Sequence, residues 1–316
     1  MTNDPLKPFI IAEVGSNWTN YDDCVQSIKE AATTGADAVK FQMFSHKELY
    51  GIDGPTMTGE LPRMWIPMLK REANKAGIEF MCTAFSPEGM AYVDNYVERH
   101  KIASSCITSE PMLYAAQRTK KTVYLSTGAS SIGEIIRAMG IVGPKTIPLY
   151  CVASYPSKVV DLRCIRMMSE SLGCKVGYSD HSTDVLNIPR HAVQMGAVVI
   201  EKHYSAINAD TPDAGHSINT SQFKLMVQSI QGVLPEPRIG WTAEEQDMVL
   251  RHRRRCVATA DIREGDKLSL GFNYGVFRTK TDDTKGLSGF SSSGISGNIA
   301  VKALSPGQGI GPNDTR

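Results

Sequence analysis

Short apolar runs alternate with amphipathic stretches along roughly the first 234 residues. Each run has the length of a buried strand, and a turn and a helical pattern follow it. The predicted strands are Ile10–Val14, Ala38–Phe44, Glu79–Ala84, Arg99–Ala103, Thr122–Ser126, Pro148–Val152, Lys175–Tyr178 and Val198–Lys202. Helical periodicity is plain over Asp22–Thr33, Glu134–Ile141 and Asn187–Gln194, with Gly35, Gly77, Gly173 and Gly196 as candidate left-handed caps.

Strand–helix units that follow one another along the chain favour an α/β fold. The specific prediction is a parallel (β/α)8 barrel over residues 1–234. A doubly wound open sheet is the alternative architecture. No GxGxxG or GxxxxGK[ST] motif follows a predicted strand, which disfavours dinucleotide and P-loop sites.

The alternation stops near Leu234 and the composition changes. Residues 235–255 are predicted to be a linker, rich in Pro and Gly at its start, with one helix over Trp241–Arg251. The basic run that ends at Arg255 is interpreted as a solvated surface or an interface, with a phosphate or RNA site as the alternative. Residues 256–316 are short apolar pieces, turns and a Ser/Gly-rich stretch, which predicts a small, mostly β domain.

Composition narrows the class of protein further. With 316 residues, 41% of them hydrophobic, the chain can fill one barrel-sized core and a small appendage. A net charge of +1 gives no sign of nucleic acid or of an anionic membrane as a partner. We expect no signal peptide and no membrane span. An odd number of cysteines, seven, without a CxxC pair favours reduced thiols and a cytoplasmic location.

Polar side chains stand where the predicted strands end, which is the end of a barrel that carries active sites. Lys40 and Lys101 lie between apolar residues on strands expected to be buried, so each ammonium must be paired. Two ammonium groups among hydroxyls would suit a phosphate and a carboxylate. The other polar strand-end residues include Glu13, Gln42, Thr83, Ser104, Ser126, Tyr155, Ser179, Asp180 and Glu201.

Two histidines, His181 and His203, follow the seventh and eighth predicted strands. These strands are neighbours in a barrel, so both imidazoles can reach one cation. With Asp180 and Glu201 beside them, they favour a site for Mn, Fe, Co or Zn that leaves positions open for substrate.

Seven motifs then occur in a fixed order: IIAEVGSN, GADAVKFQ, CTAFS, YLSTG, CVASYP, GYSDHS and EKHYS. In register they closely resemble the sialic acid synthase family, whose members condense phosphoenolpyruvate with an N-acetylated amino sugar. The tail VATADIREGDKLS resembles the antifreeze-like (SAF) domain of that family. The resemblance implies a (β/α)8 barrel, a divalent metal (usually Mn²⁺) and a domain-swapped homodimer in which each SAF domain caps the partner's barrel.

The resemblance also implies roles by position. His181 and His203 match the metal ligands, and Glu13 and Asp213 match carboxylates near the reacting centre, the latter helping to bind or activate the acceptor or a water. Arg278 matches an arginine that reaches into the partner's site, and Tyr155 matches a substrate-side tyrosine. The residues that match phosphoenolpyruvate-binding positions are Lys40, Gln42, Thr83, Lys101, Ser104, Ser126 and Ser179.

The departures from the family pattern fall on the acceptor side. Trp18 replaces a histidine, Cys106 replaces a glutamate, and Ala153 replaces an asparagine. Trp18 and Cys106 are therefore predicted to contact the acceptor, and nothing near Cys106 in sequence would activate it as a nucleophile. The hypothesis is an unchanged enol donor with an acceptor other than N-acetylmannosamine. The alternatives are the usual acceptor bound through other groups, a Schiff-base aldolase using Lys101 or Lys40, or a non-catalytic homologue that binds phosphoenolpyruvate and metal.

Overall fold

The computed structural model describes residues 7–235, 248–249, 252–279 and 286–316. The chain divides into two compact units, Met1–Glu236 and Pro237–Arg316. Most of the predicted linker and of the predicted helix Trp241–Arg251 lies outside the described residues. The two units are therefore described one at a time.

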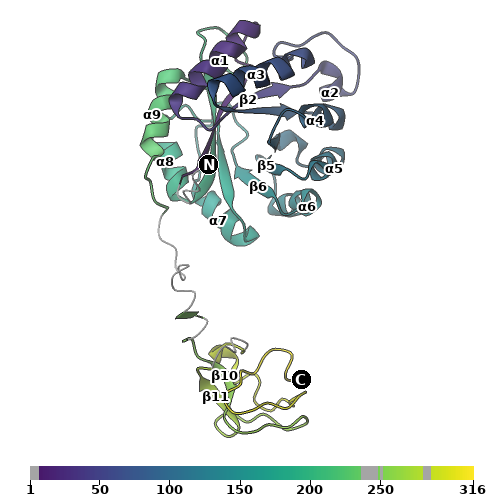
Figure 1. Cartoon of the computed structure of the whole chain (residues 1–316), viewed down its shortest axis with the longest axis vertical. Coiled ribbons are helices and arrows are strands. Elements are labelled where there is room, and N and C mark those ends of the chain that lie inside the picture. Colours follow the sequence, from purple (N-terminus) through teal and green to yellow (C-terminus); the bar gives the residue numbers. More distant parts are fainter. Residues whose placement is uncertain (1–6, 236–247, 250–251, 280–285) are drawn as a thin grey trace. The chain divides into compact units, whose positions relative to one another are not determined.

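Eight parallel strands form the centre of the first unit (Figure 1). They are hydrogen-bonded in the order β3-β2-β1-β8-β7-β6-β5-β4, and β3 and β4 contact each other at the two ends of that order. This cyclic order confirms the (β/α)8 barrel and excludes the doubly wound alternative. The strands are β1 Phe9–Gly15, β2 Ala38–Met43, β3 Glu79–Ala84, β4 Arg99–Ile102, β5 Thr122–Ser126, β6 Thr146–Tyr150, β7 Val176–Asp180 and β8 Ala197–Ser205; the short β9 Ile218–Asn219 pairs with β8.

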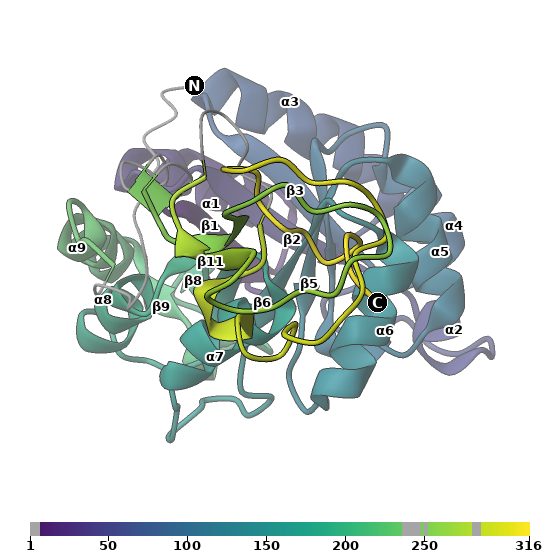
Figure 2. The same ribbon diagram turned by 90° about the horizontal axis from the view of Figure 1, so that it is seen from below.

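Helices surround these strands, as the second view makes plain (Figure 2). Gly35, Gly77 and Gly173 cap their helices in the left-handed conformation, as predicted, and Gly196 also has positive φ just after α8. The helices are α1 Tyr21–Thr34, α2 His46–Tyr50, α3 Ile66–Ala76, α4 Pro87–Val93, α5 Glu110–Thr119, α6 Ile132–Val142, α7 Arg163–Leu172, α8 Asn187–Gln194 and α9 Thr220–Ile230, with the 3₁₀ turns η1 Arg63–Trp65, η2 Ser104–Cys106 and η3 Ala214–His216.

The side-chain alternation of the strands places the site. Outward residues such as Ile10 and Phe41 join the large core beneath the helices. Inward residues form a separate apolar cluster of Ile11, Ala38, Met81, Tyr124, Leu149 and Val199. Because side chains on one face of a strand recur every two residues, the next inward positions along these strands are Glu13, Lys40, Thr83, Ser126, Cys151 and Glu201. The barrel interior therefore changes from apolar to charged toward the carboxyl ends of its strands.

Several strand boundaries differ from the predictions by one to three residues, among them those of β6, β7 and β8. Strand β6 ends at Tyr150, two residues earlier than predicted, and Val152 instead accepts a hydrogen bond from His181. Strand β8 extends to Ser205 because Tyr204 and Ser205 pair with β9. An apolar run alone cannot show either effect, since both depend on residues distant in sequence.

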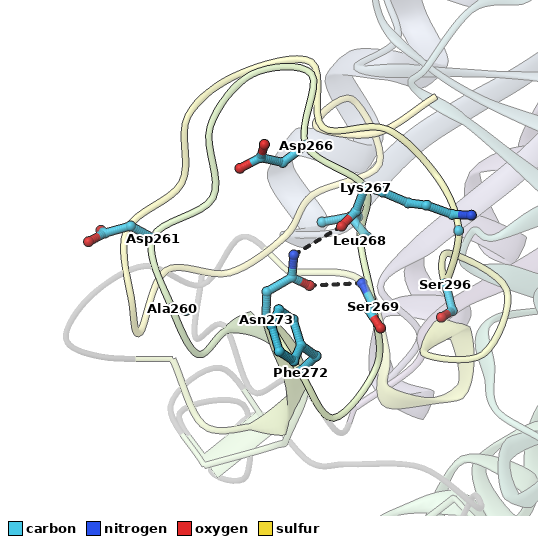
Figure 3. A pocket seen from close by; sticks show the side chains of 10 residues that line it. Ala260, Asp261, Asp266, Lys267, Leu268, Ser269, Phe272, Asn273 and Ser296 are labelled. Carbon is cyan, nitrogen blue, oxygen red and sulfur yellow. Dashed lines mark hydrogen bonds between the residues drawn. The ribbon is translucent and has the colours of Figure 1, made fainter.

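The second unit is built on β10 Arg255–Ala258 and β11 Tyr274–Phe277, which are antiparallel, with the 3₁₀ turn η4 Gly289–Ser291. Isolated bridges such as Ile262↔Leu304 join most of its other segments. Its own core includes Cys256, Ala258, Ile262, Leu268, Tyr274, Ile295, Ala300, Leu304 and Ile310. This unit has a hollow of about 730 Å³. Figure 3 shows side chains that line it, among them Asn273, which donates to the carbonyl of Lys267 and accepts from the amide of Ser269. None of the predicted site residues lines it.

Within the described ranges, no helix is both long and apolar enough to cross a membrane. All seven cysteines are present as free thiols.

Candidate active site

A buried charged cluster fills the carboxyl end of the barrel. Lys40 Nζ forms an ion pair with Glu13 and lies 3.4 Å from Glu201 Oε2. Lys101 Nζ donates to Glu201 Oε1 at 2.7 Å, and Gln42 Nε2 donates to Glu13 Oε1 at 2.8 Å. Each of the two lysines and two glutamates is at most 6% exposed. The prediction that Lys40 and Lys101 are paired is therefore confirmed, and their partners are protein carboxylates.

Burial and pairing act in opposite directions on these groups. Burial would lower the pKa of Lys40, but Glu13 and Glu201 outweigh it and raise the pKa to about 12. Burial would likewise raise the pKa of Glu201, but Lys101 and Lys40 hold it below its usual value. For Glu13, burial prevails over Lys40 and raises the pKa. Glu13 is thus the carboxyl group of this cluster that gains a proton most readily.

Hydroxyl groups surround the ammonium groups. Thr83 Oγ1 accepts from Lys40 Nζ at 3.3 Å, and Ser179 Oγ donates to Glu201 Oε1 at 2.7 Å. Ser126 Oγ is buried without a hydrogen-bond partner. Ser104 Oγ accepts from the amide of Gly128 at 3.0 Å. The carboxyl ends of β3, β5 and β7 and the turn after β4 thus bring hydroxyls to the same end of the barrel.

Histidines occupy the next level above the charged cluster. His181 and His203 have ring centroids 5.6 Å apart, and Tyr155 stacks on His181 at 4.2 Å. His181 Nδ1 donates to the carbonyl of Val152 at 2.7 Å, which fixes the ring and leaves Nε2 as its ligating atom. The structure therefore brings the two predicted histidines together at one end of the barrel.

Sequence reasoning missed a third histidine at this end. His216 ends η3 in the loop after β8, and its ring centroid lies 4.3 Å from that of His203. One ligand atom from each of His203, Asp213 and His216 lies within 4.8 Å of the others. A signal was present in the sequence, because Asp213 and His216 are three residues apart, the spacing of one 3₁₀ turn.

These side chains fit a divalent metal. His203 Nδ1 and His216 Nε2 are buried without hydrogen-bond partners, as groups awaiting a ligand would be. Burial lowers the pKa of His181, His203 and His216, so the imidazoles are neutral at pH 7 and their lone pairs are available. Nitrogen donors with one carboxylate favour a transition metal over Mg²⁺.

The glycine before the first loop makes room for the acidic group. Gly15 has a φ of +55°, and a Cβ there would lie 2.2 Å from Asp213 Oδ2. That oxygen accepts the amide of Ser16 at 2.7 Å. The turn after β1 thus holds Asp213 in place, although they are about 200 residues apart in sequence.

The predicted acceptor residues lie in different surroundings. Trp18 is 9% exposed and packs edge-on against Trp65 at 5.6 Å, with its indole N–H directed to the carbonyl of Gly15. Its position supports a packing role, and contact with an acceptor stays a prediction. Cys106 lies in η2, where burial raises the pKa of its thiol, so no activated nucleophile forms there. Arg278 is exposed just after β11 in the second unit.

Adjacent residues on β8 point to opposite faces; Glu201 was predicted among the polar residues at the strand ends, whereas Lys202 was not. Glu201 enters the charged cluster inside the barrel. Lys202 points outward and is fully buried, where it pairs with Asp180 Oδ2 at 2.7 Å. Asp180 precedes His181 in the sequence, but its carboxylate lies on the outer face of the barrel and pairs with Lys202 there.

Relatives of this chain include named sugar-acid synthases. An uncharacterized protein of Methanocaldococcus jannaschii is 35% identical, the match covering 83% of this chain and 82% of that protein. The N,N'-diacetyllegionaminic acid synthase of Legionella pneumophila is 32% identical over 71% of both chains. Pseudaminic acid synthases of Campylobacter jejuni and Helicobacter pylori are also similar.

Solved structures agree with the sequence relatives. The N-acetylneuraminic acid synthetase of Leptospira borgpetersenii superposes with a TM-score of 0.69 at 31% identity, covering 77% of this chain and 90% of that chain. The spore coat polysaccharide biosynthesis protein SpsE of Bacillus subtilis gives 0.67 at 27% identity, covering 98% and 95%. The model of the NeuB family matches residues 27–235, well over half of the sequence. The chain therefore belongs to the NeuB family.

Proposed function

We propose that this protein condenses phosphoenolpyruvate with the aldehyde form of an N-acetylated amino sugar and releases phosphate. The product would be a sialic-acid-like 2-keto-3-deoxy acid. The observation that carries the proposal is the pair of buried ammonium groups, Lys40 and Lys101, at the carboxyl end of a NeuB-family barrel. Relatives named as legionaminic, pseudaminic and sialic acid synthases support the sugar class.

The charged cluster suits an anionic donor. Lys40 and Lys101 would bind the phosphate and carboxylate of phosphoenolpyruvate, assisted by Thr83, Ser126 and Ser179, whose hydroxyls lie at the same end of the barrel. In the absence of donor, Glu13 and Glu201 neutralise both ammonium groups. The lysines are therefore held in position before the donor arrives, which limits the reorganisation that binding requires.

The reaction can be written with its atoms balanced. The methylene carbon of phosphoenolpyruvate forms a bond to the aldehyde carbon, and the aldehyde oxygen takes up a proton. Water adds to the resulting cationic C2 and loses a proton. The C2 hydroxyl then gives up its own proton to become the keto group as the C–O bond to phosphate breaks, and phosphate leaves with that proton. Glu13 is placed to carry one of these protons, because burial raises its pKa toward neutrality. Asp213 Oδ1 is the candidate to hold the acceptor or the water.

A metal would sit at the histidine level, held by His181 and His203 as predicted, with Mn²⁺ as the first candidate. Such an ion supplies Lewis-acid polarisation of the aldehyde oxygen when bound. The protein's own contribution there is orientation: Val152 fixes His181, and Tyr155 covers its ring.

A Schiff-base aldolase is disfavoured by the charge on Lys40. An amine must be neutral to attack a carbonyl, and the paired carboxylates raise the pKa of Lys40 to about 12. The same pairing keeps Lys40 charged, as binding of an anionic donor requires.

One assay tests the proposed function. Phosphate release from phosphoenolpyruvate is measured with Mn²⁺ or with EDTA, across aldehyde sugars that include N-acetylmannosamine and sugars with two acetamido groups. We expect release with Mn²⁺, none with EDTA, and preference for an acceptor other than N-acetylmannosamine. Efficient use of N-acetylmannosamine would overturn the acceptor hypothesis. No release with any acceptor would support a non-catalytic homologue instead.

The proposed SAF cap and domain-swapped dimer have their own test. His181→Ala and Arg278→Ala should each be inactive if the second unit of one subunit completes the barrel of the other. Co-refolding the two variants should restore roughly a quarter of wild-type activity, since about half of the dimers would be mixed and each would contain one complete site. No recovery from a confirmed mixed dimer would contradict the swap.

A further inference from the structure

The loop after β8 carries two metal-binding side chains on one turn. The 3₁₀ turn η3 separates Asp213 from His216 by three residues, so both face the same side. Together with His203 they form the group of three potential ligand atoms within 4.8 Å of one another. His203 is 7% exposed and His216 is 7% exposed, so water reaches them poorly.

The two oxygens of Asp213 have different surroundings. Oδ2 accepts the amide of Ser16 at 2.7 Å, which orients the carboxylate. Oδ1 lies 3.6 Å from His216 Nε2, too far for a hydrogen bond. One oxygen is thus anchored and the other is free beside an imidazole nitrogen, which is how a carboxylate ligand is commonly held.

Two imidazole nitrogens at this site also lack a protein partner. Within the part of the chain that the structure describes, His203 Nδ1 and His216 Nε2 are buried without hydrogen-bond partners. His181 differs, because its Nδ1 bonds Val152 and its Nε2 lies 3.3 Å from Ser179 Oγ. His203 and His216 therefore each have a buried nitrogen available to a ligand, whereas both nitrogens of His181 already have a contact.

We propose that His216 and Asp213 bind the divalent cation directly, together with His203. The inference deepens the metal site of the proposed function and assigns Asp213 Oδ1 to the cation in place of the acceptor or water. Two imidazole nitrogens and one carboxylate oxygen suit Mn²⁺, Fe²⁺, Co²⁺ or Zn²⁺ and leave positions open. His181 can join only by giving up its contact with Ser179.

Metal binding without substrate tests this directly. The full chain is stripped with a chelator, and MnCl₂ is titrated in while electron paramagnetic resonance reports free Mn²⁺. We expect His216→Gln and Asp213→Asn each to raise the dissociation constant about 10- to 100-fold. The control His191→Gln, exposed on α8, should stay within about twofold. Electron spin echo modulation should lose one imidazole nitrogen in His216→Gln.

The outcomes separate this inference from the proposed function. An unchanged dissociation constant in His216→Gln, or an effect confined to His181→Gln, would overturn it. If His216→Gln does not fold, Asp213→Asn gives the same readout, because its amide oxygen still accepts the Ser16 N–H. A chain that binds Mn²⁺ through His216 but never releases phosphate would keep this inference and refute the condensation.

Discussion

Two neighbouring residues of β8 each belong to a buried ion-pair cluster, and the two clusters differ in their surroundings. Glu201 faces the barrel interior, where it meets Lys101 and Lys40. Lys202 faces the helices, where it meets Asp180. Both clusters bury charges, and burying a charge pair costs free energy unless hydrogen bonds complete it.

The difference lies in how fully each cluster is satisfied. Lys202 Nζ donates to Asp180 Oδ2, to the carbonyl of Ser182 at 2.5 Å and to that of Asp184 at 2.9 Å. Inside the barrel, Ser126 Oγ has no hydrogen-bond partner among the described residues, and Glu201 Oε2 has only Lys40 Nζ, 3.4 Å away. A saturated cluster has no capacity for a ligand, whereas an incomplete one can accept it. The outer cluster thus has the character of a structural ion pair, and the inner one suits the donor binding proposed above.

The largest effect is expected from Lys101→Ala. The variant loses a donor to the substrate and leaves Glu201 facing an anionic donor, so kcat/KM should fall by about 10⁴-fold or more. Stability should change less, because Glu201 keeps Lys40 and Ser179. Phosphate release and urea denaturation measure the two quantities. If Lys101→Ala instead lost stability while its folded molecules kept the wild-type kcat/KM, the inner cluster would be structural like the outer one.

Lys202→Met should produce the opposite pattern. Asp180 Oδ2 and two backbone carbonyls would lose their donor in a fully buried site, which should lower the free energy of unfolding by about 3–5 kcal/mol. Molecules that stay folded should keep the wild-type KM for phosphoenolpyruvate. A stable variant with a greatly raised KM would show that Lys202 acts on the inner site.

The fold could be predicted further than the site. Period-two strands, helical periodicity and glycine caps are local signals, and they located all eight barrel strands, though the bounds of β6 and β8 were off. The paired lysines also followed locally, because an apolar strand cannot leave an ammonium unpaired. Which carboxylates pair with them depends on the register of β1, β2 and β8 across the barrel.

The acceptor side shows why sequence falls short. Trp18 packs against Trp65, a contact that neither residue's own surroundings in the sequence reveal, and its contact with an acceptor stays a prediction. His216 was not predicted as a site residue, because a single histidine in a loop indicates little by itself. Its proximity to His203 is seen only in the folded chain. Both contacts form only once the chain has folded, and the three-residue spacing of Asp213 and His216 was the local sign of the second one.

Gly15→Ala should have an intermediate effect, and it should change both the stability of the fold and the binding of metal at the site. The new Cβ meets Asp213 Oδ2 and strains a backbone of positive φ, so stability should fall by about 1–3 kcal/mol and Mn²⁺ should bind more weakly. Gly140→Ala in α6 is the matched control, because nothing lies within 4 Å of its Cβ. It should stabilise by about 0.5–1 kcal/mol. Calorimetry and Mn²⁺ titration give both readouts, and equal effects at the two sites would contradict the role of Gly15.

The smallest effect concerns pH and another outward-facing group, His100 on β4. Burial lowers its pKa below the usual 6.5, although Asp94, 2.8 Å away, opposes the shift. The unfolded chain therefore takes up a proton below about pH 6.5 that the folded chain refuses. The free energy of unfolding should fall as pH drops below 6.5 and should change little from this source above it.

The pH profile of the variant His100→Gln tests that assignment. Burial lowers the pKa of His181, His203 and His216 in the same sense, so the wild-type loss includes all four residues. Urea denaturation at several pH values in chelator should show a shallower acid loss in His100→Gln, by up to about 1.4 kcal/mol per pH unit. Turnover at pH 7.5 should be unchanged, because His100 faces away from the charged cluster. An unaltered profile would mean that the inner histidines alone make the fold sensitive to acid.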